Sequence, residues 1–198
     1  MSTAAAPDPW HTGQMRVLGR QLLTTATLLE EAGVTAPLTI TCHCEEGPSV
    51  ELLASDRLSI ADQRTVVDRV AALLGAIPSV KRLFGEQYAV FCEGYRDGFL
   101  IIASTHSGTP RPAVLEPASD SSDTAAFLRS ILSWATAPRI QTLVVRETAG
   151  SHAVTAWCAN ARDAEAALAG LVPETQQGRG IRALLPTGHP VTVRVSIT

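Results

Sequence analysis

Residues 38–55, LTITCHCEEGPSVELLAS, decide the fold that we predict for this chain. Ile40, Cys42 and Cys44 alternate with polar residues, and this period of two is typical of a strand with one buried face. The glycine and proline of EEGPS favour a turn, and a second alternating strand follows. Leu53 breaks the alternation of this second strand. The segment therefore predicts a β-hairpin.

The pattern of this hairpin returns later in the chain. Gly47 and Gly150 lie 150 − 47 = 103 residues apart, and at this offset Thr39 falls on Thr142 without a gap. The match rests on hydrophobic class more than on identity. It favours two copies of a helix–hairpin–helix–hairpin unit. The alternative is that any α+β chain can be slid along itself until some apolar residues coincide.

Apolar spacing and capping residues predict four helices between the strands. Ser59 is the expected N-cap of the second helix, with Asp62 three residues later as in a capping box. The apolar residues expected to form the buried stripe of this helix are Val66, Val67, Val70, Leu73, Leu74 and Ile77. The helices are expected near 14–32, 59–77, 123–136 and 163–171. Besides the first hairpin, strands are expected near 88–104, 140–147 and 152–157, and in a last hairpin that turns at 186–189.

These elements predict an α+β fold with two similar halves. Antiparallel sheets would be covered on one face by helices, and an approximate pseudo-two-fold axis would relate the halves. The stretch at 105–122 is rich in proline, serine and glycine, which is typical of a linker. The expected organisation is a disordered tail at 1–12, a first half at 13–104, this linker and a second half at 123–198.

Composition excludes some classes of function. The net charge of −3 over 198 residues provides no strong electrostatic footprint for nucleic acid. We find neither a signal peptide nor an apolar run long enough to span a bilayer, so we expect a cytoplasmic protein that does not contact a membrane. Of the 16 basic residues only Lys81 is lysine, which favours a GC-rich coding sequence and a bacterial source.

The triplet Cys42-His43-Cys44 is the strongest metal-binding candidate in the sequence. Two thiols on one face of a strand could contribute to a zinc site, but a tetrahedral site needs two further ligands. Cys92, Cys158 and His152 are the candidates for these, and none lies in a metal-binding spacing. The preferred interpretation is that both cysteines are small buried hydrophobes, so no metal and no cofactor is expected.

Other motifs do not point to catalysis. Residues 178–183 match GxGxxA, but no strand precedes them and no helix follows, so a loop is expected in place of a dinucleotide site. His106, His152 and His189 fall in or beside predicted turns, where we expect solvated side chains. The sequence contains no GxSxG, HExxH or P-loop pattern. Nothing assembles an acid, a base and a pocket.

The remaining candidates are surface residues that could contact a partner. Arg146 and Arg194 are expected on the outer faces of strands, His43 on the strand face opposite the cysteines, and Trp134 at the core edge or at an interface. The favoured function is a non-catalytic adaptor or regulator that binds a protein partner, with a homodimer as one form. One alternative is nucleic-acid binding through the outer sheet face of the second half. The other is an enzyme of unknown reaction with a small-molecule pocket.

Overall fold

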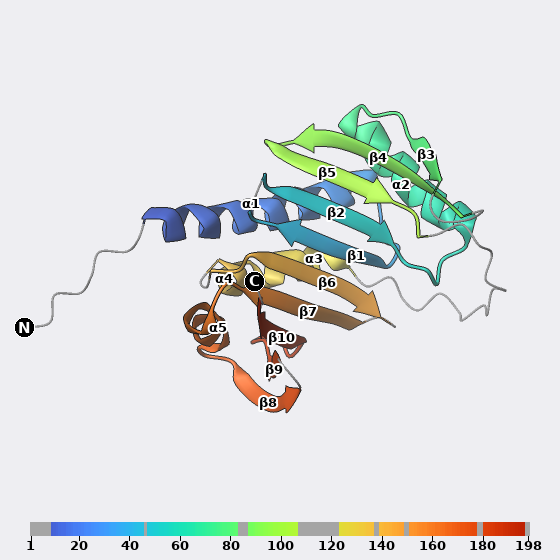
Figure 1. Ribbon diagram of the computed structural model, residues 1–198. Helices are drawn as coiled ribbons and strands as arrows, with labels where there is room; N and C mark the ends of the chain where they lie inside the picture. Colours follow the sequence, from blue (N-terminus) through green and yellow to red (C-terminus); the bar gives the residue numbers. More distant parts are fainter. Residues whose placement is uncertain are drawn as a thin grey trace, which may run out of the picture.

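A single ten-stranded sheet forms the centre of the molecule, and helices lie along it (Figure 1). The computed structural model describes residues 9–45, 47–82, 87–106, 123–136, 139–148, 151–177 and 180–196. The predicted linker at 105–122 lies almost wholly outside these residues. The α+β class expected from the sequence is confirmed.

The helices and strands follow in the order below. The helices are α1 (Pro9–Ala32), α2 (Ile60–Leu74), α3 (Thr124–Ser130), α4 (Leu132–Ala135) and α5 (Ala161–Leu168). The strands of the part before α3 are β1 (Leu38–His43), β2 (Ser49–Ala54), β3 (Ser79–Arg82), β4 (Tyr88–Arg96) and β5 (Phe99–Ser104). The later strands are β6 (Thr142–Thr148), β7 (Ser151–Cys158), β8 (Val172–Gln177), β9 (Gly180–Leu184) and β10 (Pro190–Val195).

The strand order of the sheet is β3-β4-β5-β2-β1-β6-β7-β10-β9-β8. The hairpins β1–β2 and β6–β7 meet through antiparallel pairing of β1 with β6. The pairs β2–β5 and β7–β10 are parallel, so the expectation of purely antiparallel sheets is wrong. The edge strands β3 and β8 were not expected either, because neither segment shows a clear alternation of apolar and polar residues.

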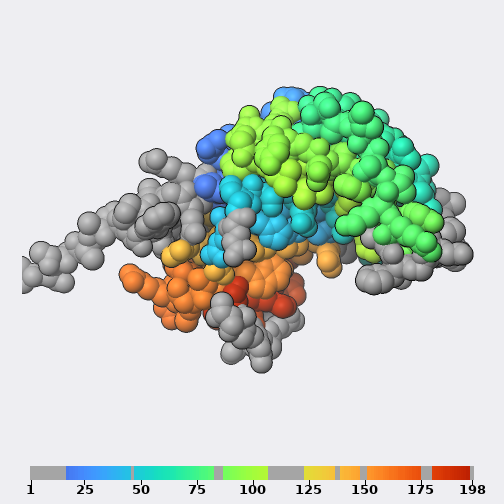
Figure 2. All heavy atoms as spheres, turned by 45° about the horizontal axis from the view of Figure 1, so that its top comes forward, coloured from blue at the N-terminus to red at the C-terminus, as the bar shows by residue number. Residues whose placement is uncertain are grey.

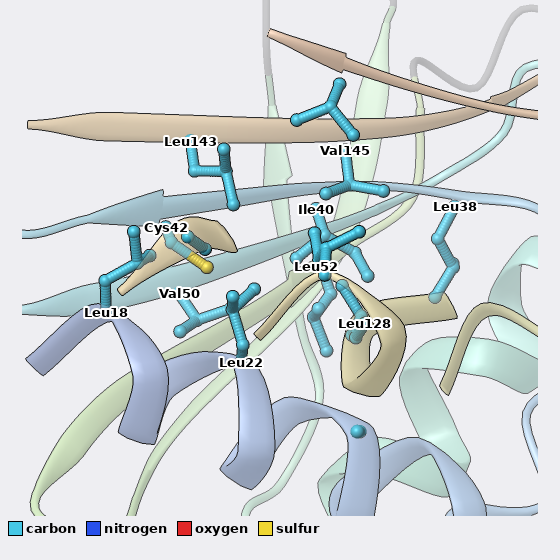
Figure 3. Packing of buried hydrophobic residues seen from close by; sticks show 14 of the residues in the cluster. Leu18, Leu22, Leu38, Ile40, Cys42, Val50, Leu52, Leu128, Leu143 and Val145 are labelled. Atoms are coloured by element: carbon cyan, nitrogen blue, oxygen red, sulfur yellow. The ribbon is translucent and has the colours of Figure 1, made fainter. Parts of the chain in front are cut away.

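The core lies between one face of the sheet and the helices. Helix α1 packs against α2, α3 and α4 and crosses over β1 and β2. Figure 3 shows Leu18 and Leu22 of α1 and Leu128 of α3 pointing toward the inner face of the β1–β2 hairpin, which also carries Ile40 and Leu52. All five side chains are at most 1% exposed, so the alternation in residues 38–55 marks the buried face as predicted.

Local signals set several element ends. The Ser59 side chain accepts a hydrogen bond from the backbone N–H of Asp62, which confirms the predicted cap of α2. Gly75 ends this helix with φ 62°. The predicted stripe is wrong at its C-terminal end, because Leu73 is 39% exposed and Ile77, beyond the helix, is 90% exposed.

Two other helix boundaries differ from the prediction. Helix α1 begins at Pro9, inside the segment expected to be a tail, and residues 1–8 lie outside the described part. The third predicted helix is divided at Ile131 into α3 and the short α4. A single apolar periodicity runs through both pieces, so the division could not be read from it.

The turns between strands follow the sequence closely. Asp97 and Gly98 both have positive φ angles, 52° and 83°, as a two-residue hairpin turn between β4 and β5 requires. The GxGxxA segment is not a loop throughout, because residues 180–184 form β9. Within the described residues, no helix is long and apolar enough to span a membrane.

Candidate functional site

The side of the sheet that faces away from the described helices is the candidate surface. In the described part of the chain, the helices pack on the opposite face (Figure 1). We call the outward-facing residues of the six central strands the open face. Its members are Leu100, Ile102, Ser104, Ser49, Glu51, Leu53, Thr39, Thr41, His43, Thr142, Val144, Arg146, Ala153, Thr155, Trp157, Pro190, Thr192 and Arg194.

Register aligns these residues in rows that cross the strands. In the central row Ile102 pairs with Glu51, Glu51 with Thr41, Thr41 with Val144, and Val144 with Thr155. Residues paired in this way point to the same face of a sheet and contact one another. The central row therefore crosses from the first hairpin to the second without interruption.

Apolar residues occupy part of this solvent-facing surface. Leu53, Leu100, Ile102, Val144 and Trp157 belong to the open face and are half-buried. Figure 2 shows the cyan atoms of the β1–β2 hairpin between the lime atoms of β4 and β5 and the orange atoms of the second half. Large apolar areas on an exposed surface are typical of binding sites. Leu53, which breaks the alternation in the sequence, is the one signal of this surface in residues 38–55.

The open face carries opposite charges on its two sides. Glu51 lies on β2, and Glu93 on β4, two strands away across β5, faces the same way. Arg146 on β6 and Arg194 on β10 are exposed, as predicted from the sequence. The two candidate arginines thus share one side of the face, and the acidic residues share the other.

His43 is on the open face, near the junction of the two hairpins. Its Nε2 lies 3.7 Å from Oε1 of Glu51, and both side chains are partly exposed. A hollow of about 340 Å³ adjoins it, lined by His43, Glu45, Gln141, Thr142 and Ser196. The Gln141 amide donates a 2.8 Å hydrogen bond to Glu45. The hollow is shallow and polar, so it adds hydrogen-bonding groups to one end of the open face.

Cys42 and Cys44 face the core. Cys42 is 1% and Cys44 7% exposed, and burial raises the pKa of both thiols, that of Cys44 to about 12. The Cys44 thiol donates a hydrogen bond to the side-chain oxygen of the buried Gln21 at 3.6 Å. Among the described residues, no group of three or more potential ligands could hold a metal ion. The geometry fits small core residues with thiols that stay protonated.

Trp134 does not belong to an exposed surface. It is 9% exposed, and its indole N–H donates a 2.8 Å hydrogen bond to the carbonyl of Ala167 in α5. The interface role considered for Trp134 therefore has no support in this geometry, and we leave it out of the candidate site. Trp157, which the sequence analysis did not single out, is the tryptophan of the open face.

The histidines are placed differently from the prediction. His152, expected to be solvated, is 4% exposed and stacks on Phe127 with ring centroids 4.2 Å apart. Its Nε2 lies 3.2 Å from the Thr124 hydroxyl, which itself donates to Glu147. Burial lowers the pKa of His152, so the neutral form is favoured. His189 packs edge-on against the same phenylalanine, and His106 is exposed.

Thr124, His152 and Glu147 do not form a nucleophile site. The Thr124 hydroxyl is itself buried, and it donates its proton to the carboxylate while the imidazole contacts it from the other side. A catalytic base must instead accept the proton of a nucleophile that substrate can reach. The cluster fits a packing role between α3, β6 and β7.

No protein-family model, curated protein or solved structure matches this chain significantly.

Proposed function

We propose that this chain is a non-catalytic protein-binding module, an adaptor or regulator, whose contact surface is the open face. The observation that carries the proposal is the row of solvent-facing side chains that runs from Ile102 through Val144 to Thr155 across five paired strands. A solvent-facing sheet surface that carries half-buried apolar side chains beside charged ones resembles a protein interface, where apolar and charged groups are interspersed.

The charges specify the chemistry of the partner. A matching surface would be apolar where it meets Leu53, Leu100 and Ile102, basic where it meets Glu51 and Glu93, and acidic where it meets Arg146 and Arg194. His43 and the adjoining hollow would contribute hydrogen bonds at one end of the strands. The sequence also makes the predicted linker at 105–122 a candidate contact surface, and its residues 107–122 lie outside the described part of the chain.

An internal duplication is part of the same proposal. The register of β1 with β6 supports it: Thr41 pairs with Val144, and 144 − 41 = 103, the offset found in the sequence. His43 pairs with Thr142, which is Thr39 shifted by the same offset. This is the pairing that a pseudo-two-fold axis between β1 and β6 would produce. Each half also repeats one order of strands, counted outward from the β1–β6 junction. The hairpin comes first, then a strand parallel to the outer strand of the hairpin, then an antiparallel strand and finally the edge strand.

Site-directed photo-crosslinking in cells tests the binding module. The photoreactive residue p-benzoylphenylalanine replaces Thr41 or Thr155 of the open face, or as matched controls the exposed Arg64 of α2 or Glu165 of α5. The expected result is a discrete protein adduct from both open-face positions and none from the helix positions. Adducts from the helix positions alone would move the contact surface to the other side of the molecule.

Nucleic-acid binding is the second candidate because Arg146 and Arg194 are exposed on the same face. The register places them two strands and four residues apart, about 16 Å. The acidic residues on the remaining part of the face oppose this function. Titration with DNA and RNA at about 50 mM salt decides it, because phosphate contacts are strongest at low salt. Measurable binding that weakens in Arg146→Ala would favour this candidate.

A further inference from the structure

We infer that the protein occupying the open face is a second copy of this chain, related to the first by a two-fold axis that runs parallel to β1 and β6. The inference rests on the proposed function, since both use the open face. It follows from the position of the charges in the strand register. An isologous dimer requires that one surface be complementary to itself, and this face can be tested for that property.

Two face-to-face arrangements with an axis in the plane between the sheets keep the strands of both copies aligned. If the axis lies across the strands, each strand lies over its own copy, and Glu51 faces the Glu51 of the second copy. If the axis lies along the strands above the β1–β6 junction, β2 lies over the second copy's β7. The acidic side of one copy then faces the basic side of the other. Like-charge contacts are unfavourable, so the axis along the strands is preferred.

The register gives the contacts of Glu51 in this dimer. Glu51 and Thr155 belong to the same cross-strand row, so Glu51 faces the second copy's Thr155. Arg146 and Arg194 each lie one strand and two residues from Thr155, which is about 8 Å in a sheet. Glu51 therefore points between two arginines of the second copy. The symmetry produces this cluster twice.

The apolar residues are also compatible with the arrangement. The axis passes above the Thr41–Val144 pair, Leu53 faces the second copy's Ala153, and bulky Trp157 faces a serine, Ser49. In these two pairs a large residue opposes a small one, whereas Leu100 of β5 faces Arg194 and Ile102 faces Thr192. Six strands and six residues per strand cover about 29 Å by 20 Å, or roughly 600 Å² in projection. Because side chains project from the plane of the sheet, the accessible area buried in the dimer would exceed this projected area. A stable interface buries about 800 Å² per partner.

Charge reversal provides the test. Sedimentation analysis of the wild-type chain, 20.9 kDa, is expected to give a dimer mass of 2 × 20.9 = 41.8 kDa. Glu51→Arg alone places three like charges in each cluster, and so does the double variant Arg146→Glu/Arg194→Glu. Each is expected to weaken dimerisation at least about tenfold and to sediment as a monomer. All three residues are exposed, so circular dichroism should be unchanged.

Mixing the two monomeric variants is the decisive step. Glu51→Arg in one chain then faces the two introduced glutamates in the other, while Glu51 of the second chain faces Arg146 and Arg194 of the first. A heterodimer is expected although neither variant dimerises alone. Glu165→Arg, on the exposed side of α5, is the matched control and should leave the wild-type dimer intact.

The outcomes separate this inference from the proposed function. A wild-type monomer at high micromolar concentration, or a dimer that survives both charge reversals, would overturn the self-association. In that case crosslinks from Thr41 and Thr155 to a protein of different mass would still support the binding module. Absence of any open-face adduct together with a monomer would reject both.

Discussion

Leu52 and Leu53 are neighbours on β2 with the same side chain, yet they have different surroundings. Leu52 points toward the helices and is 1% exposed, whereas Leu53 points to the open face and is half-buried. Two other pairs repeat the contrast: Trp134 with Trp157, and His152 with His43. In each pair, one residue is enclosed by helices and the other lies on the open face.

The comparison shows that the two sides of the sheet are apolar for different reasons. On the helix side, the aliphatic residues of β1, β2, β6 and β7 are fully enclosed, so their burial stabilises the folded chain. On the open face, the apolar residues stay in partial contact with water and contribute less to folding. In the proposed function these side chains would contact the partner, since large exposed apolar areas are typical of binding sites.

The leucine pair should show the largest difference. Leu52→Ala is expected to lower the free energy of unfolding by about 2–5 kcal/mol, because it leaves a cavity in the core. Leu53→Ala should cost about 1 kcal/mol or less. Urea denaturation at low protein concentration measures both without a contribution from association. Equal losses would mean that the open face is packed as tightly as the core.

The tryptophan pair should differ by a smaller amount. Trp134→Phe removes the indole N–H that pairs with the buried carbonyl of Ala167, which should cost about 1–3 kcal/mol. Trp157→Phe should change stability by about 0.5 kcal/mol or less. The same denaturation experiment measures both variants. A larger loss for Trp157→Phe would reverse the assignment of the two sides.

The histidine pair should differ in pH dependence, which is the smallest of the three effects. Burial lowers the pKa of His152 in the folded chain below its usual value of 6.5. Between the two pKa values the unfolded chain binds more protons, so stability is complete above about pH 6.5 and falls as the pH decreases through this window. His152→Gln should reduce the loss of stability between about pH 7.5 and 5.5.

His43→Gln is the matched control for this experiment, because His43 lies on the open face and not in the core. Its loss of stability over the same pH range should remain close to that of the wild type. Urea denaturation at both pH values provides the measurement. If both variants behaved like the wild type, carboxyl groups elsewhere in the chain would account for the pH dependence.

Features that depend on neighbouring residues were predictable. The Ser59 cap, the Asp97-Gly98 turn and the alternation of Ile40 and Cys42 each rest on contacts within a few residues. The outward position of Arg146 follows from the same alternation. Such features can be predicted from the sequence because the backbone hydrogen bonds or the side-chain period that cause them are local.

The errors occur where distant segments decide the outcome. His152 was expected in solvent, but Phe127 of α3 covers its ring. Trp134 could not be assigned from the apolar stripe of its helix, because α5 supplies the group it bonds to. Edge strand β8 contains Pro173 and pairs with β9 in an irregular register, so its sequence does not show the alternation that predicts a strand. Each case depends on contacts that cross the fold.

The sequence by itself determined the approximate positions of most helices, the hairpins β1–β2, β4–β5 and β6–β7, and the buried face of β1–β2, because periodicity and capping act over a few residues. Only the tertiary structure decided that β1 pairs with β6, that β5 runs parallel to β2 and β10 parallel to β7, and that the described helices all pack on one face of the sheet. Strand pairing is set by register and packing between segments far apart in the chain, and the same register aligns Glu51 with the row between Arg146 and Arg194.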